Sequence, residues 1–161
     1  MPVLTAPERK PLVAKLKTLP NELQAAVKGL TPEQLNTPYR EGGWTVAQVV
    51  HHVADSHLNA YARMKLILTE DKPMLKGYSQ DVWAAREDAK STQIAPSLTL
   101  LKGLHKRWIA MIKKVGRAEW KRTGLHSERG EVTLDDMLTI YAGHGEKHVG
   151  HILGLRKQKG W

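Results

Sequence analysis

Three of the chain's eight histidines fall within residues 141–152, at the spacing of a single helix face. At about 100° of rotation per residue, His148 lies roughly 40° round from His144, and His151 lies roughly 20° to the other side. Two imidazoles four residues apart on a helix can chelate one divalent ion. The first chemistry that this sequence suggests is therefore metal binding through histidine nitrogens.

The helix face that carries these histidines is also apolar. Within about the same 120° of rotation lie Met137, Ile140, Tyr141, Ile152 and Leu155. A buried imidazole without a polar partner loses about 1–3 kcal/mol. Each ring therefore needs either a metal ion or ordinary partners such as a backbone carbonyl and a water, and both interpretations stay open here. A metal site also needs a third ligand from elsewhere in the chain.

A polar stripe on an earlier helix offers that third ligand. About 100° of this helix holds Gln48, His52, Asp55, Ser56 and Asn59, and Arg63 continues the same line. On periodicity alone the stripe could be the solvent face of the helix. However, its first four turns contain no lysine, arginine or glutamate, and such a line is also typical of the lining of a polar pocket.

Composition narrows the chemistry further. The 161 residues include no cysteine, so any metal must be held by histidine, aspartate or glutamate. The formal net charge is +9, but the basic residues are dispersed and do not alternate with aromatic ones. We therefore expect a solvated basic surface, or a preference for an anionic small substrate or an acidic partner, and no nucleic-acid partner.

The elements that must position these residues are helices. Turn signals divide the chain into four long helical segments, at about residues 7–28, 46–69, 96–115 and 134–156, with Thr45 and Thr133 as N-caps and no convincing strand. We expect one all-α domain over residues 1–161, a four-helix bundle whose facing helices can build a site. Gly143, Gly150 and Gly154 share one side of the last helix, which predicts close approach of a neighbouring helix there.

The sequence contains no apolar run of signal-peptide or membrane-spanning length. We therefore expect a cytoplasmic protein with no membrane partner.

Besides Trp44, there are tryptophans at positions 83, 108, 120 and 161. Together they form more apolar area than one bundle is expected to cover.

Several motifs, taken in order, resemble the DinB-like superfamily of metal-binding four-helix bundles. The resemblance is closest to its YfiT branch, which includes metal-dependent hydrolases and bacillithiol S-transferases. It runs from about Gly43 to the last residue and is carried by Gly43-Trp44-Thr45, the run from His51 to His57, Leu68-Thr69-Glu70-Asp71, the segment with His144, His148 and His151, and the closing Gly160-Trp161.

This resemblance implies that His52, His144 and His148 bind one divalent metal ion and that the protein is a homodimer. We expect the ion to be zinc or nickel, although imidazole ligands also suit copper and iron. His51 points about 100° away from His52 and is the less suitable neighbour. Because only neutral imidazole coordinates, metal affinity is expected to fall as the pH drops through the histidine range near 6.5.

Three imidazoles without a fourth protein ligand make an open site, which can activate either a water or a thiol. Hydrolysis and thiol transfer both follow, and the resemblance favours transfer of an anionic low-molecular-weight thiol. Asp55 is the predicted catalytic residue, either as base or by orienting a ligand ring. Arg63 and Arg156 are candidates for binding an anionic substrate group. The alternative is a metal-binding stress-response scaffold without turnover.

Overall fold

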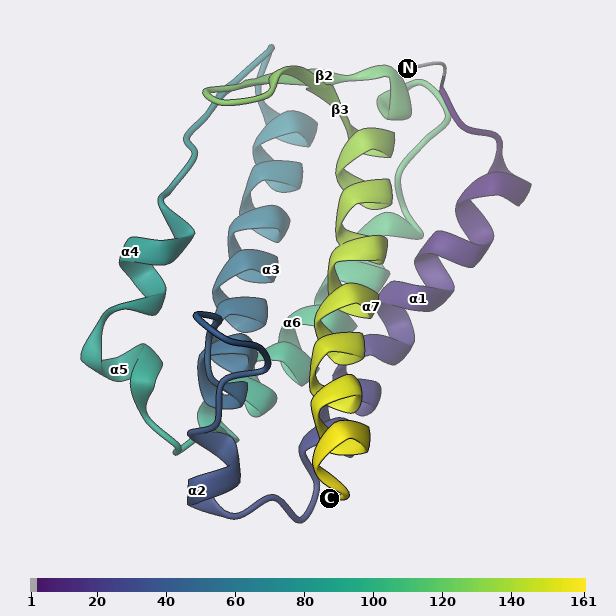
Figure 1. Cartoon of the computed structure of the whole chain (residues 1–161). Coiled ribbons are helices and arrows are strands. Elements are labelled where there is room, and N and C mark those ends of the chain that lie inside the picture. The colour runs from purple at the N-terminus through teal and green to yellow at the C-terminus, as the bar shows by residue number, and fades with distance from the viewer. Residues whose placement is uncertain (1–2) are drawn as a thin grey trace.

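The computed structural model describes residues 3–161 and contains four long helices. They are α1 (Ala6–Val27), α3 (Val46–Thr69), α6 (Ala95–Ile112) and α7 (Leu134–Lys159). Each boundary lies within three residues of its predicted position, and the all-α four-helix bundle is confirmed (Figure 1). Within this described range, no helix combines the length and the apolar character that crossing a bilayer requires.

Threonines set the starts of three of the four long helices. The hydroxyl of each capping threonine accepts a hydrogen bond from the backbone N–H of the residue three positions later. The side chain of that later residue in turn accepts a hydrogen bond from the backbone N–H of the threonine. This capping box opens α1 at Thr5, the short helix α2 (Pro32–Leu35) at Thr31, α3 at Thr45 and α7 at Thr133. The predicted N-caps at Thr45 and Thr133 are thus confirmed.

The order of the helices requires a long crossover. In Figure 1, α3 and α6 run in one direction and α1 and α7 in the other, so the chain must return along the bundle between α3 and α6. That return carries β1 (Met74–Leu75), α4 (Gln80–Ala84) and α5 (Glu87–Lys90). Both α4 and α5 pack against α3. The polar stripe of α3 is therefore covered by this crossover segment and is not a free solvent face.

The expectation of no strand is wrong. β1 pairs in parallel with β2 (Thr123–His126), and β2 pairs antiparallel with β3 (Gly130–Thr133). A short 3-10 helix, η1 (Glu119–Lys121), precedes β2 in the chain. The strands have only two to four residues each, too few for alternation to stand out in the sequence. His126 consequently lies in a strand at the end of the bundle.

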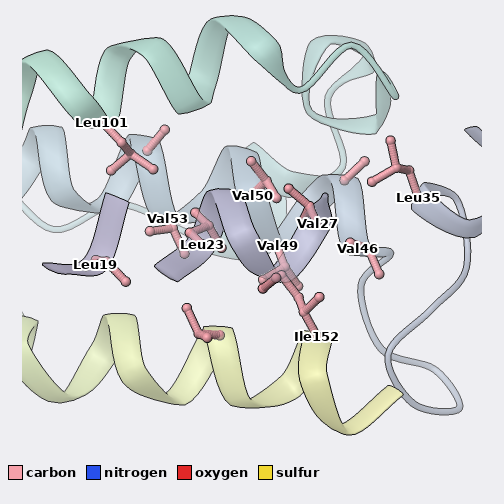
Figure 2. Close-up of a cluster of buried hydrophobic side chains, with 14 of the residues drawn as sticks. Leu19, Leu23, Val27, Leu35, Val46, Val49, Val50, Val53, Leu101 and Ile152 are labelled. Atoms are coloured by element: carbon pink, nitrogen blue, oxygen red, sulfur yellow. The ribbon is translucent and has the colours of Figure 1, made fainter. Parts of the chain in front are cut away.

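Two apolar clusters fill the bundle, one toward each end. The first, drawn in Figure 2, includes Leu23 of α1, Val53 of α3 and Ile152 of α7. The second includes Met64 of α3 and Trp108 of α6. Along the chain, four histidines (His57, His105, His144 and His148) lie between the residues that α3, α6 and α7 contribute to the two clusters, whereas His52 lies among the first-cluster residues of α3. We call these five residues the histidine layer: His52, His57, His105, His144 and His148.

The close helix approach on α7 occurs at a different glycine from those predicted. A Cβ at Gly143, Gly150 or Gly154 would meet nothing within 4 Å, whereas at Gly145 it would lie 2.4 Å from Cδ2 of Leu19. The prediction failed because helical periodicity identifies a side of α7 but does not say which side α1 packs against.

Candidate metal centre

Three histidines from two helices converge at the centre of the bundle. One ring nitrogen from each of His52, His144 and His148 lies within 4.8 Å of those of the other two. The Nε2 atoms of His52 and His144 are 3.1 Å apart, and tetrahedral zinc with bonds of 2.0–2.1 Å requires ligand nitrogens about 3.3 Å apart. The structure thus brings together the residues that the resemblance implies, at a spacing that suits one ion.

Burial keeps these three rings neutral. It is the largest effect on each, lowering the pKa of His52 to about 4, that of His144 to about 3 and that of His148 to about 2. Neighbouring rings and Lys147 lower the pKa values of the two α7 histidines further, whereas Asp81 raises that of His52. The site is therefore in its metal-binding form well below pH 6.5, which corrects the expected titration range.

The donor set fits a divalent ion. The buried Nδ1 of His148 has no hydrogen-bond partner among residues 3–161, an unmet capacity of the kind that bound ions and their solvent satisfy. No aspartate, glutamate or further histidine of the described chain joins the group. Three imidazoles with no fourth protein ligand form an open site and suit zinc, nickel, copper or iron.

Aromatic side chains from the segment before α3 pack on the outer side of the trio. Trp44 lies 4.6 Å from His52 and stacks against His148 at 6.5 Å, measured between ring centroids. Tyr39 stacks on His151 at 4.3 Å. His151 follows the trio on α7 but does not belong to the group of converging nitrogens. This packing restricts the rotation of the rings of His52, His148 and His151.

On the inner side, a chain of hydrogen bonds leaves the trio. His144 Nδ1 lies 3.1 Å from His57 Nε2, His57 Nδ1 lies 3.0 Å from His105 Nε2, and His105 Nδ1 lies 2.6 Å from the carbonyl oxygen of Leu16. Burial lowers the pKa of His57 and of His105, so both rings are neutral. Sequence reasoning left His57 without a role and missed His105, although His105 interrupts the apolar stripe of α6 between Leu104 and Trp108.

Other predicted residues lie outside the trio. His51 turns away, as expected, and its ring nitrogens contact Ser97 Oγ and the Ser91 carbonyl, both at 2.8 Å. Asp55 is half-buried, and burial raises its pKa while His51 lowers it. In the described part of the chain, its carboxylate has no hydrogen bond to the three rings.

The two predicted arginines have different surroundings. Arg156 donates to the carbonyls of Ala26 and Lys28 at 2.8 and 3.0 Å, so it is committed to the end of α1. Arg63 is only 7% exposed and donates to the Lys76 carbonyl at 2.5 Å and to the Tyr141 hydroxyl at 3.4 Å. Of the two, only Arg63 lies close enough to the histidine layer to contact a substrate there.

Two cavities meet at His144. His144 lines one of about 440 Å³, together with Arg63, Tyr78, His126 and Tyr141 among others. His144 and His148 line the second, of about 400 Å³, which also reaches Trp44 and His151. Asp81 of α4 lines both cavities. Sequence reasoning missed Asp81, because only the crossover segment brings α4 over the histidines.

The charge of Arg63 has no carboxylate partner within salt-bridge distance among residues 3–161. Arg9, in contrast, makes two hydrogen bonds of 2.6 and 2.8 Å with the two carboxylate oxygens of Asp135. A buried cation without an anion is costly. Arg63 therefore gives the larger cavity an unbalanced positive group beside His144.

Comparisons with known proteins agree with this geometry. The family model described as the DinB superfamily matches residues 15–152. A "Putative metal-dependent hydrolase" of Geobacillus thermodenitrificans (strain NG80-2) is 46% identical over 157 residues, which cover 97% of this chain and 88% of that relative. A protein of the same description from Geobacillus kaustophilus (strain HTA426) is 48% identical over 150 residues, or 92% of this chain and 84% of that relative.

The fold has a solved counterpart. YfiT from Bacillus subtilis, described as "a probable metal-dependent hydrolase with an unusual four-helix bundle topology", matches with a TM-score of 0.95 and 39% identity, over 98% of this chain and 91% of that one. The family model covers most of the chain, and the solved structure has the same arrangement of helices. In this chain, three histidines also converge between the helices. We conclude that this chain belongs to the DinB superfamily.

Proposed function

We propose that this chain is a metal-dependent enzyme in which His52, His144 and His148 hold one divalent ion, zinc or nickel. The observation that carries the proposal is a trio of neutral imidazoles where two cavities meet, with no fourth ligand from residues 3–161. An ion held with an open position acts as a Lewis acid and makes a water or a thiol more acidic.

Asp81 is the group best placed to accept the proton that such activation releases. Its carboxylate lines both cavities and acts electrostatically on His52. Asp55, the residue predicted from the sequence, is the weaker candidate because its charge interacts with His51 and Asp88. Asp81→Asn is expected to lower kcat by 10- to 100-fold with little change in metal content, and Asp55→Asn is expected to have a smaller effect.

Arg63 gives a reason to expect an anionic substrate. A carboxylate or phosphate group in the larger cavity would supply the counter-charge that the described residues do not give this buried guanidinium. The formal net charge of +9 favours the approach of such a molecule. Arg63→Met is expected to raise KM for anionic substrates by about tenfold or more and to leave KM for neutral analogues nearly unchanged.

Two reactions fit the site. Hydrolysis is supported by the descriptions of the relatives, and transfer of a small anionic thiol is supported by the resemblance of the motifs and by the basic charge. The metal-loaded protein should be assayed with ester and amide substrates, and with small electrophiles in the presence of several low-molecular-weight thiols. Metal-dependent turnover in one panel identifies the reaction, whereas no turnover in either favours the non-catalytic scaffold.

The homodimer stays a prediction. Trp108 and Trp120 are buried in this chain's own core, so they do not supply the uncovered area expected from the sequence. Trp83, 42% exposed, remains available for a contact between two copies. Analytical ultracentrifugation at micromolar concentration tests the prediction, and a strict monomer would contradict it.

A further inference from the structure

We propose that His57 and His105 are positioning residues that fix the tautomer of His144, so that the lone pair of its Nε2 faces the histidine trio. This inference rests on the proposed metal site for its purpose, but its evidence is the hydrogen-bond chain from Leu16 to His144. The chain links α1, α6, α3 and α7, the four long helices of the bundle.

The hydrogen-bond chain begins at a carbonyl oxygen that has no backbone hydrogen-bond donor within α1. The Leu16 oxygen would normally accept from the backbone N–H of residue 20, but that residue is Pro20, which has no N–H and lies inside the helix. The Nδ1 of His105, 2.6 Å away, satisfies this oxygen. Because a carbonyl oxygen can only accept, His105 must carry its proton on Nδ1.

Each following proton position is then determined. A neutral imidazole has one N–H and one lone pair, so the bare Nε2 of His105 accepts from the Nδ1–H of His57 at 3.0 Å. The bare Nε2 of His57 accepts in turn from the Nδ1–H of His144 at 3.1 Å. His144 therefore presents an unprotonated Nε2 to the trio, 3.1 Å from the Nε2 of His52.

This arrangement prepares His144 to bind a metal before the metal arrives. The nitrogen that a histidine offers to a metal is set by the hydrogen bond that its other nitrogen makes. A metal-binding histidine usually donates its second N–H directly to a carboxylate or a carbonyl. Here two buried rings connect that N–H to the Leu16 carbonyl, and no water is needed at either ring because all their nitrogens are paired.

The primary test is ¹⁵N NMR of the histidine rings in the metal-free protein. We expect His57, His105 and His144 to be Nδ1–H tautomers, and we expect His57→Phe to remove this preference at His144. An Nε2–H tautomer at His144 in the unsubstituted chain, a doubly protonated His57, or an unchanged His144 signal in His57→Phe would overturn the proposal.

Metal affinity supplies a second readout, by competition between the protein and a chromophoric chelator for zinc. His57→Phe should weaken binding by 10- to 100-fold. His57→Gln, whose amide oxygen can accept from His144, should recover most of the loss. Equal losses in both variants would indicate a packing role only. If the tautomers are as expected but the chain binds no metal, the proposed function fails while the hydrogen-bond chain stands.

Discussion

The apolar clusters draw side chains from all four long helices, whereas the histidine layer draws its five from α3, α6 and α7, and the two regions are stabilised in different ways. In the clusters, side chains such as Leu23 and Val53 are fully buried and gain free energy from the area removed from water, whatever their neighbours' identity. In the layer, burial is unfavourable unless each nitrogen meets a partner. The rings of His57 and His105 are fully paired, whereas the buried Nδ1 of His148 has no hydrogen-bond partner in the part of the chain that the structure describes. The difference indicates that the clusters hold the bundle together and that the trio of His52, His144 and His148 is the part of the histidine layer available for binding.

The strongest test of this division is the loss of a proposed metal ligand. His148→Ala and His52→Ala should each reduce metal content from about one ion per chain to nearly none, because two imidazoles hold an ion far more weakly than three. Elemental analysis after dialysis measures the content. His126→Ala, outside the trio, is the control and should keep its metal. Full metal occupancy in both ligand variants would show that these histidines do not form the metal site.

The opposite result is expected in the first apolar cluster. Leu23→Ala removes a fully buried side chain and should lower the free energy of unfolding by about 2–5 kcal/mol, with metal stoichiometry unchanged. Denaturant titration of the metal-free protein measures the loss. Leu153→Ala, at an exposed position on α7, should stay within about 0.5 kcal/mol of the unsubstituted chain. A Leu23→Ala protein that is stable but metal-free would contradict the division.

Two glycines on α7 offer a matched pair with opposite signs. Gly145→Ala forces a methyl group against Leu19 and should destabilise the bundle by about 1–3 kcal/mol. Gly143→Ala meets open space and should stabilise α7 by up to about 1 kcal/mol. Thermal or denaturant unfolding of both variants is the measurement. If Gly145→Ala were the more stable of the two, α1 would not approach α7 at that glycine.

The smallest effect concerns pH. The trio's pKa values of about 4, 3 and 2 imply that zinc affinity between pH 7 and 5.5 changes by less than about threefold, whereas a ring with an ordinary pKa near 6.5 would lose nearly tenfold. Chelator competition at both pH values measures this change in affinity.

The same lowered pKa values affect the stability of the metal-free protein. As the pH falls, the three histidines are protonated in the unfolded chain before they are protonated in the folded chain. The histidine contribution to the free energy of unfolding is therefore complete above about pH 6.5 and declines as the pH falls toward 4.

Much of the fold could be predicted because its signals are local. Capping threonines and a 3.6-residue period placed the long helices to within three residues. The short strands escaped because two to four residues cannot establish an alternation. Asp81 was missed as a cavity residue, and so was Arg129, which lines the larger cavity from the turn between β2 and β3. The segments that carry them have no pattern pointing to the site, and only the crossover and the β2–β3 turn bring them there.

The sequence by itself determined that His144 and His148 share one face of a helix, because helical rotation per residue is a local property of the backbone. With the family motifs, it also pointed to His52. Only the tertiary structure decided the state of these rings. Their pKa values depend on burial, and the tautomer of His144 depends on a carbonyl of α1 that Pro20 leaves free and on two rings from α6 and α3. Such through-space contacts between distant segments leave no periodic trace in the chain.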